Sequence, residues 1–383
     1  MPTHEREITR PADLCLPGGR RLDRAAVGWS RTPLHRCGLR GWGRTKRWEY
    51  WCVTTPTHLV AVTVADIDYL GLGSVYFLEY GRGNGRDGGG AGTGPGAGPG
   101  GGGRAGTGSL GTIRREISRT ALLPLAHGVR LPHSLGGGTG GTGGAGGAGG
   151  DGERGEAAVA AGPVRIGMRQ ERDGTRLRFR CRTAEGPLDG DLFVAMPPGH
   201  ETMSVVIPWS DRRFQYTSKH TARPAEGTVR IGGTAYDFQG GWGVLDHGRG
   251  RWPYDTRWNW GAASGSTDGR VVGLQFGGRW TAGTGMTENA LCVDGRLTKI
   301  GEELEWHYDD FGEPWTIRTP GSDAVDLSFT PFHVREDRTN TGVILNDTHQ
   351  SFGHYTGTVR ADGGTGIRVE GLLGWAEQVR MRW

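Results

Sequence analysis

The chain has 383 residues, and its 45 Lys and Arg against 41 Asp and Glu leave a formal net charge of only +4. This small excess argues against a dedicated nucleic-acid binder, which concentrates basic residues on one face. No run of about 18 apolar residues occurs, and the charged opening MPTHEREITR lacks the apolar segment of a secretory signal, so we expect a cytoplasmic protein without a membrane span.

Length and cysteine usage limit the architecture further. A single core stops growing near roughly 250–300 residues, so a chain of this length is expected to form two domains. The five Cys are scattered and form no CxxC pair, and the twelve His form no HxH or HExxH pattern. These spacings disfavour a disulfide framework and a zinc site, and we expect neither a metal nor another cofactor.

Short β-branched and aromatic runs separated by turn residues dominate the chain, which predicts an all-β fold with few helices. Asp173-Gly174 and Asp294-Gly295 have the composition of tight hairpin turns. Many short strands at this spacing indicate barrels or sandwiches. In chain order, we expect strands at 48–54, 59–64, 74–80, 164–170, 176–182, 191–196, 204–208, 228–231, 271–276, 291–293, 304–308, 315–318, 324–329, 342–345, 353–359 and 367–370.

Two tracts rich in Gly, Ala and Thr interrupt this pattern, at residues 81–111 and 135–162. Such a composition cannot bury enough apolar surface to offset chain entropy, so we expect two disordered insertions. The first tract follows a strand-like run and is expected to enlarge a hairpin connection. A linker-like run at 223–227 predicts an N-terminal β domain of residues 1–225 and a C-terminal β domain of residues 226–383.

The segment 241–286 combines Trp rings with titratable groups. Asp246 and His247 are candidate catalytic residues, because an apolar cavity raises the pKa of a carboxyl and keeps a His near neutrality, as general acid–base chemistry requires. The alternative is a structural Asp–His contact in a turn, with the rings plugging the end of a barrel. In both cases a Gly/Arg loop is expected at residues 248–251, before Trp252. The side chains expected to bind a ligand in the second domain are Trp252, Tyr254, Trp258, Asn259, Trp260, Asn289 and Trp375.

Two further features of this half of the chain bear on a ligand site. Trp258 and Trp260 lie two residues apart on an expected strand and so share a face, which either holds an isoprenoid, an acyl chain or a sugar ring or fills a core. Glu288 follows a Gly-containing run and is a third candidate catalytic residue; the alternative is that it pairs with an Arg. The GTG element in that run lacks Walker spacing, so nucleotide binding is not expected.

Six blocks between Glu5 and Trp383 resemble a known family: EREITRPADLCLPGGRRLDRAAVGWSRTPLHRC, KRWEYWCVTT, VTVADIDYLG, RGRWPYDTRWNWGAASG, GGRWTAGTGMTENAL and LLGWAEQVRMRW. The family is DUF2804, a domain of unknown function. More distantly, the Asp–His pair near a WxW pattern resembles tandem lipocalin-like proteins, which include AttH-type proteins and carotenoid hydratases. That second resemblance implies two calycin-type barrels with an apolar ligand between or within them, and acid-catalysed hydration of an isoprenoid double bond as one conceivable reaction.

These observations predict a protein that binds a hydrophobic small molecule, such as a lipid or an isoprenoid, in a β-barrel or interdomain pocket. The alternative is an enzyme in which Asp246 donates a proton to such a ligand and His247 or Glu288 handles water. A third hypothesis is a carbohydrate-active protein that uses Glu288 with a second carboxylate. The sequence does not predict the oligomeric state.

Overall fold

The chain folds almost entirely into β-strands. The computed structural model describes residues 3–81, 112–135, 155–342 and 344–383. In this part of the chain the helical elements are two short 3-10 turns, Arg24–Ala26 and Asp362–Gly364, and no helix is long and apolar enough to cross a membrane. The predicted all-β fold is confirmed. The predicted disorder of the Gly-rich tracts falls mainly on residues outside the described ranges.

The first of two large antiparallel sheets contains 14 strands from the described residues. They are β2 (Trp29–Ser30), β4 (Thr45–Thr54), β5 (His58–Asp66), β6 (Leu70–Tyr80), β7 (Ile113–Pro124), β8 (Val129–Arg130), β9 (Glu156–Val159), β10 (Val164–Gln170), β11 (Gly174–Thr183), β12 (Gly186–Ala195), β13 (Met203–Ser210), β14 (Arg213–Ile231), β15 (Thr234–Asp237) and β16 (Gly241–Arg251). The main order is β7-β6-β5-β4-β16-β14-β12-β11-β10-β9-β8, with β13 and β15 also paired to β14 and β2 paired to β13.

The second sheet contains nine strands of the described part of the chain, in the order β20-β19-β18-β17-β25-β24-β23-β22-β21. They are β17 (Asp255–Thr267), β18 (Arg270–Gly278), β19 (Asn289–Val293), β20 (Arg296–Ile300), β21 (Glu305–His307), β22 (Trp315–Arg318), β23 (Val325–Asn340), β24 (Leu345–Arg360) and β25 (Gly366–Arg382). A separate parallel pair joins the two-residue strands β1 (Ala12–Asp13) and β3 (His35–Arg36).

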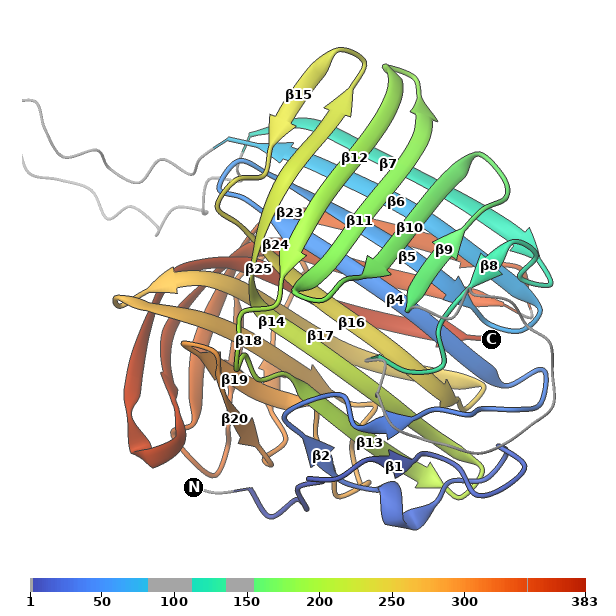
Figure 1. Ribbon diagram of the computed structural model, residues 1–383. Helices are drawn as coiled ribbons and strands as arrows, with labels where there is room; N and C mark the ends of the chain where they lie inside the picture. The colour runs from blue at the N-terminus through green and yellow to red at the C-terminus, as the bar shows by residue number, and fades with distance from the viewer. Residues whose placement is uncertain (1–2, 82–111, 136–154, 343) are drawn as a thin grey trace, which may run out of the picture.

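Side-chain alternation explains how the first sheet forms its core. In β10, Val164, Ile166 and Met168 are buried, whereas Arg165 and Arg169 are exposed, because successive side chains of a strand point to opposite faces. The buried faces of β9–β12 and β4–β7 share one apolar cluster. Figure 1 shows β9–β12 crossing over β5–β7, so the first sheet folds back on itself around this cluster.

The second sheet has its own core and also packs against the first. Val325, Leu327 and Phe329 of β23 alternate with exposed polar residues and join an apolar cluster inside the second sheet. A further cluster contains residues of both sheets, including Val244 of β16 and Trp375 of β25. The central strands of the two sheets therefore meet along a buried interface, and the candidate site lies there.

The run 223–227, which the sequence predicts to be a linker, lies inside β14. Arg223 and Pro224 pair with β16, and Gly227 pairs with β12. The linker interpretation is wrong because a register shift after His220 lets Pro and Gly bend the strand without ending it. The chain passes from one sheet to the other between Arg251 and Asp255. The division into domains at residues 225 and 226 stays a prediction.

Three other local expectations differ from the structure. Part of the tract predicted as an insertion at 135–162 forms β9, whose Ala157 and Val159 are buried in the first core. Of residues 342–345, expected as a strand, Gly342 and Ile344 lie outside the strands, with a φ of 82° at Gly342, and Leu345 is the first residue of β24. Residues 248–251, expected as a loop, form the end of β16.

Two turn predictions are confirmed. Asp294 and Gly295 have φ angles of 48° and 79°, as the two central residues of a type I′ hairpin require, and they connect β19 to β20. The first Gly-rich tract connects β6 to β7, which pair antiparallel along their whole length. It therefore enlarges a hairpin connection, as the sequence predicts.

Candidate functional site

A row of polar side chains crosses the central strands of the first sheet. Asp246 on β16 pairs in register with Tyr50 on β4 and with Lys219 on β14. Side chains at paired positions lie on the same face, so these three groups are neighbours. The Lys219 Nζ atom lies 3.0 Å from Asp246 Oδ1, and the two side chains are only 5% and 13% exposed. A charged pair is thus enclosed where the sheets meet.

A second carboxylate reaches the same lysine from the segment before β19. Glu288 Oε2 lies 3.4 Å from Lys219 Nζ, the Trp280 Nε1 group donates a hydrogen bond of 2.7 Å to Glu288 Oε1, and Oε2 accepts no hydrogen bond within the described chain. Gly277 makes room for this carboxylate, since a Cβ atom there would lie 2.1 Å from Glu288 Cγ. Lys219 is therefore the shared counter-ion of Asp246 and Glu288.

A third carboxylate belongs to a facing row on the second sheet. Glu377 on β25 pairs in register with Trp260 on β17 and with Gln350 on β24. Its Oε1 accepts a hydrogen bond of 3.0 Å from Trp258 Nε1, and its Oε2 accepts one of 3.2 Å from Gln350 Nε2. The Lys219 ammonium lies 4.3 Å from the centre of the Trp260 ring, which brings the two rows into contact.

The buried charges shift one another's protonation. Burial raises the pKa of Glu288 and of Glu377 to about 7 each; Lys219 acts against this rise and Asp246 adds to it. Burial alone would lower the pKa of Lys219, but Asp246 and Glu288 together hold it above its usual value. Lys219 therefore stays charged, and Glu288 and Glu377 are each partly protonated near neutral pH. A carboxyl in that state can donate a proton.

Aromatic rings enclose the charged groups in two clusters. In the first, Trp260 contacts Tyr50 and Trp375 edge to face, with ring centroids 5.6 and 5.2 Å apart. In the second, Trp252 stacks on Trp280 at 5.4 Å. Further rings in contact with Trp252 are those of Trp48, Trp209, Trp258 and Trp383. Because its rings pack against one another, the second cluster serves as a core that braces Trp280 and Trp258.

His247 does not join Asp246. The two residues are adjacent on β16, so their side chains point to opposite faces of the sheet. His247 is fully buried on the other face, where its Nδ1 lies 3.3 Å from Glu49 Oε1. Burial, followed by the charge of Arg249, lowers the pKa of His247 to about 4. Asp246 and His247 therefore form neither the predicted facing pair nor the alternative contact in a turn, and a catalytic role for either residue stays a prediction.

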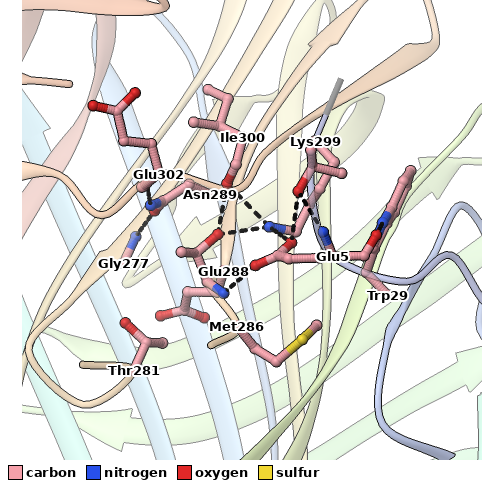
Figure 2. Close-up of polar contacts among 12 residues, drawn as sticks. Glu5, Trp29, Gly277, Thr281, Met286, Glu288, Asn289, Lys299, Ile300 and Glu302 are labelled. Atoms are coloured by element: carbon pink, nitrogen blue, oxygen red, sulfur yellow. Dashed lines mark hydrogen bonds and ion pairs between the residues drawn. The ribbon is translucent and has the colours of Figure 1, made fainter. Parts of the chain in front are cut away.

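Three of the predicted ligand-binding residues do not join the charged groups. One is exposed, and the other two use their side chains in hydrogen bonds within the protein. Tyr254 is 40% exposed, and the Arg44 guanidinium lies 5.2 Å above its ring. Asn259 is buried and donates to Tyr308 Oη and to the Glu377 carbonyl, both at 3.1 Å. Asn289 accepts a hydrogen bond from the Gly277 amide and donates one to the Glu302 carbonyl (Figure 2). Of the predicted residues, Asp246, Glu288, Trp258, Trp260 and Trp375 come together.

Lys219, which lies between Asp246 and Glu288, was not predicted from the sequence. The expected partner of Glu288 was an Arg, but the cation is a lysine. The chain contains only three Lys, at positions 46, 219 and 299, and the structure buries all three, with exposures of 0%, 5% and 3%. Lys is almost never fully buried without a partner, so this rare residue in an Arg-rich chain was a usable signal.

Surface hollows lie elsewhere. A groove of about 630 Å³ runs over the outer face of β8–β12 and is lined by Arg and acidic residues. Cross-strand ion pairs explain this composition: Arg178 lies 3.1 Å from Asp191, and Arg180 lies 2.8 Å from Asp189. A smaller hollow of about 200 Å³ is lined by His200 and Trp242 among others. Neither hollow includes Lys219 or its carboxylates.

The space that Gly277 leaves for Glu288 can be tested directly. Gly277→Ala should lower the free energy of unfolding by about 1–3 kcal/mol, because the added methyl group would overlap the Glu288 side chain. Gly366→Ala is the matched control, since a Cβ atom at that strand position meets nothing within 4 Å. Urea denaturation of the two variants checks the prediction, and equal losses would show that Glu288 moves aside freely.

The family model of the "Domain of unknown function (DUF2804)" matches residues 5–383. The chain belongs to the DUF2804 family. This confirms the resemblance carried by the six sequence blocks. No curated protein matches this DUF2804 chain.

Solved structures similar to this DUF2804 protein include two of related fold. Kievitone hydratase from Nectria haematococca is 8% identical with a TM-score of 0.43, and the match covers 88% of each chain. An AttH-type protein from Nitrosomonas europaea is 11% identical with a TM-score of 0.41, and the match covers 88% of this chain and 92% of that one. Because both TM-scores lie below 0.5, nothing about the chemistry of this chain follows from either likeness.

Proposed function

We propose that the protein binds a small, largely hydrophobic molecule that carries a polar group, where the central strands of the two sheets meet. The observation that carries this proposal is the enclosed Lys219, held by Asp246 and Glu288 against the Trp260 ring. A buried cluster of charges usually stabilises a protein less than apolar residues of the same volume would. Stability alone therefore does not explain why this cluster is present. Perturbed, enclosed titratable groups beside apolar walls are typical of functional sites.

The ligand would approach on the side of Asp246 and Trp258. Asp246 keeps 13% of its side chain accessible, and Trp258 is also only partly buried, whereas Glu288 is 2% exposed. In this arrangement the polar group of the ligand bonds to Asp246 or Lys219, and its apolar body lies against Trp258 and Tyr50. An indole supplies a large apolar area with little loss of conformational entropy, which suits this role.

Farnesol, an isoprenoid alcohol, and palmitate, a fatty acid, are suitable probes of this site. We expect either probe to quench tryptophan fluorescence in a saturable titration, and Trp258→Ala to weaken binding roughly tenfold or more, as loss of a buried aromatic contact does. Trp42→Ala is the matched control, because Trp42 is 70% exposed and lies outside both aromatic clusters. Equal affinity in the two variants, or no saturable binding of either probe, would count against the site.

A second candidate function, general acid catalysis on such a ligand, is favoured by the raised pKa values of Glu288 and Glu377. In a hydration, the carboxyl would protonate one alkene carbon, water oxygen would bond to the other, and a carboxylate would take the proton that the water loses. We assign the donor role to Glu288 or Glu377, and we assign Asp246 the role of counter-ion to Lys219 because of their salt bridge.

Variants separate binding from catalysis. If a carboxyl donates the proton, Glu377→Gln or Glu288→Gln should lower the turnover of farnesol roughly 100-fold or more while leaving its affinity nearly unchanged, because a proton donor acts mainly in the transition state. Product formation can be followed by mass spectrometry in ¹⁸O-labelled water. Binding of farnesol without any labelled product would leave the protein as a binder only.

A further inference from the structure

The N-terminal segment inserts a glutamate into the second sheet. Glu5 precedes β2 and forms an ion pair with Lys299 on β20, and both side chains are almost completely buried, at 0% and 1% exposure. Figure 2 shows Glu5 and Lys299 facing each other beside Ile300. The Trp29 Nε1 group donates a hydrogen bond of 3.2 Å to the Glu5 carbonyl, which fixes the segment at this depth.

Both members of this pair also hold Thr287. The Thr287 amide donates a hydrogen bond of 2.5 Å to Glu5 Oε1, and Lys299 Nζ donates one of 2.6 Å to Thr287 Oγ1. On the other side of Glu288, Asn289 is anchored to Gly277 and Glu302. Glu288 therefore lies between two anchored residues, and its backbone position depends directly on the Glu5–Lys299 pair.

The same pair balances charge near Glu288. The largest electrostatic effects on Glu288 come from Lys219 and Asp246, and Trp280 donates a hydrogen bond to it. Burial lowers the pKa of Lys299, whereas the charges of Glu5, Glu288 and Glu303 act to raise it. Glu303 also accepts hydrogen bonds from Thr281. Without Glu5, Glu288 and Glu303 would be the carboxyls left to compensate the Lys299 charge.

We propose that Glu5 is a positioning residue that sets the location and protonation of Glu288 through Lys299 and Thr287. The site between the two sheets would then be complete only when the N-terminal segment is docked. The importance of this for catalysis rests on the proposed acid role of Glu288, but the coupling itself is a property of the protein without ligand.

A set of three full-length variants tests the coupling without any ligand. In Glu5→Gln, the uncompensated Lys299 charge should lower the pKa of Glu288 by roughly 1 unit. In Lys299→Met, the uncompensated Glu5 carboxylate should raise the pKa of Glu288. In the double variant both charges are absent, so the pKa of Glu288 should return toward the wild-type value. The readout is a ¹³C-detected carboxyl titration, with the Glu288 signal assigned by its absence in Glu288→Gln.

Opposite shifts in the single variants, cancelled in the double variant, would establish the coupling, because a general loss of packing would not reverse on removal of a second group. An unchanged Glu288 titration in a folded Glu5→Gln protein would overturn the proposal. If Glu5→Gln fails to fold, Lys299→Met and the double variant still test the proposal. Glu288 titrations that are identical in these two variants and in the wild type would also overturn the proposal. Failure of farnesol to bind would affect the proposed function and leave this result standing.

Discussion

Replacing Lys219 with Met is expected to lower the free energy of unfolding by about 3–5 kcal/mol at pH 7.5. The substitution leaves Asp246 and Glu288 enclosed without the ammonium group that now lies 3.0 and 3.4 Å from them. Two carboxylates without a cation repel each other in a medium that screens charge poorly. Urea denaturation followed by circular dichroism measures the loss.

The Lys219 result needs a comparison with an ordinary ion pair. Asp191→Asn removes the shared partner of Arg176 and Arg178 on the outer sheet face, where the three side chains are 34–68% exposed, and should cost no more than about 1 kcal/mol. The Lys219→Met loss should also shrink at low pH, because protonation of the two carboxyls removes the repulsion. A loss similar to that of Asp191→Asn at every pH would mean that the enclosed charges interact far less than their distances indicate.

Glu377→Gln should stabilise the protein relative to wild type by an amount that grows as the pH rises from 4.5 to 7. The pKa of Glu377 is about 7 in the folded protein and 4.5 in the unfolded chain, so over this interval the folded state retains a proton that the unfolded state has lost. The wild type therefore loses up to about 3 kcal/mol of stability from this group as the pH rises, and the loss is complete above pH 7. Glutamine resembles the protonated carboxyl and does not incur this loss.

The difference between Glu377→Gln and wild type at matched pH isolates this effect. His247 acts in the opposite direction, since its lowered pKa of about 4 makes stability rise with pH between 4 and 6.5, but this contribution cancels in the difference. Glu370→Gln is the control, because this exposed carboxyl lies 2.6 Å from Arg368. It should change the free energy of unfolding by less than about 1 kcal/mol at both pH 4.5 and pH 7.5. A Glu377→Gln difference that stays constant from pH 4.5 to 7.5 would contradict the raised pKa.

The strand pattern was predictable where β-branched residues alternate, as in β5 and β10, and less so where glycine fills a strand. β16 contains four glycines, and the sequence suggested a loop over part of it. The structure shows the reason for two of them: a Cβ atom at Gly248 would lie 2.1 Å from the Trp48 ring, and one at Gly250 would lie 2.1 Å from Gln215 Oε1. Glycine here accommodates large side chains of neighbouring strands, which a single-sequence pattern does not show.

The candidate site was predictable in part for a related reason. Asp246, Trp258, Trp260 and Glu288 were found because carboxylates beside Trp in one short segment stand out in the sequence. Lys219, the shared partner of Asp246 and Glu288, lies on β14, and Glu377, the partner of Trp258, lies on β25, so only cross-strand register brings these groups together. His247 was expected beside Asp246 because the two residues are neighbours in the sequence, whereas neighbours on a strand face opposite sides.

The most direct test of the central claim is a ¹³C-detected titration of the glutamate carboxyls in the wild-type protein, with and without farnesol. Glu288 and Glu377, assigned from their Gln variants, should titrate near pH 7, and farnesol should shift both signals while leaving that of the exposed Glu370 in place. Titration of both carboxyls near pH 4.5, with no response to farnesol or palmitate, would show that the cluster around Lys219 is an ordinary ion-pair network and not a ligand site.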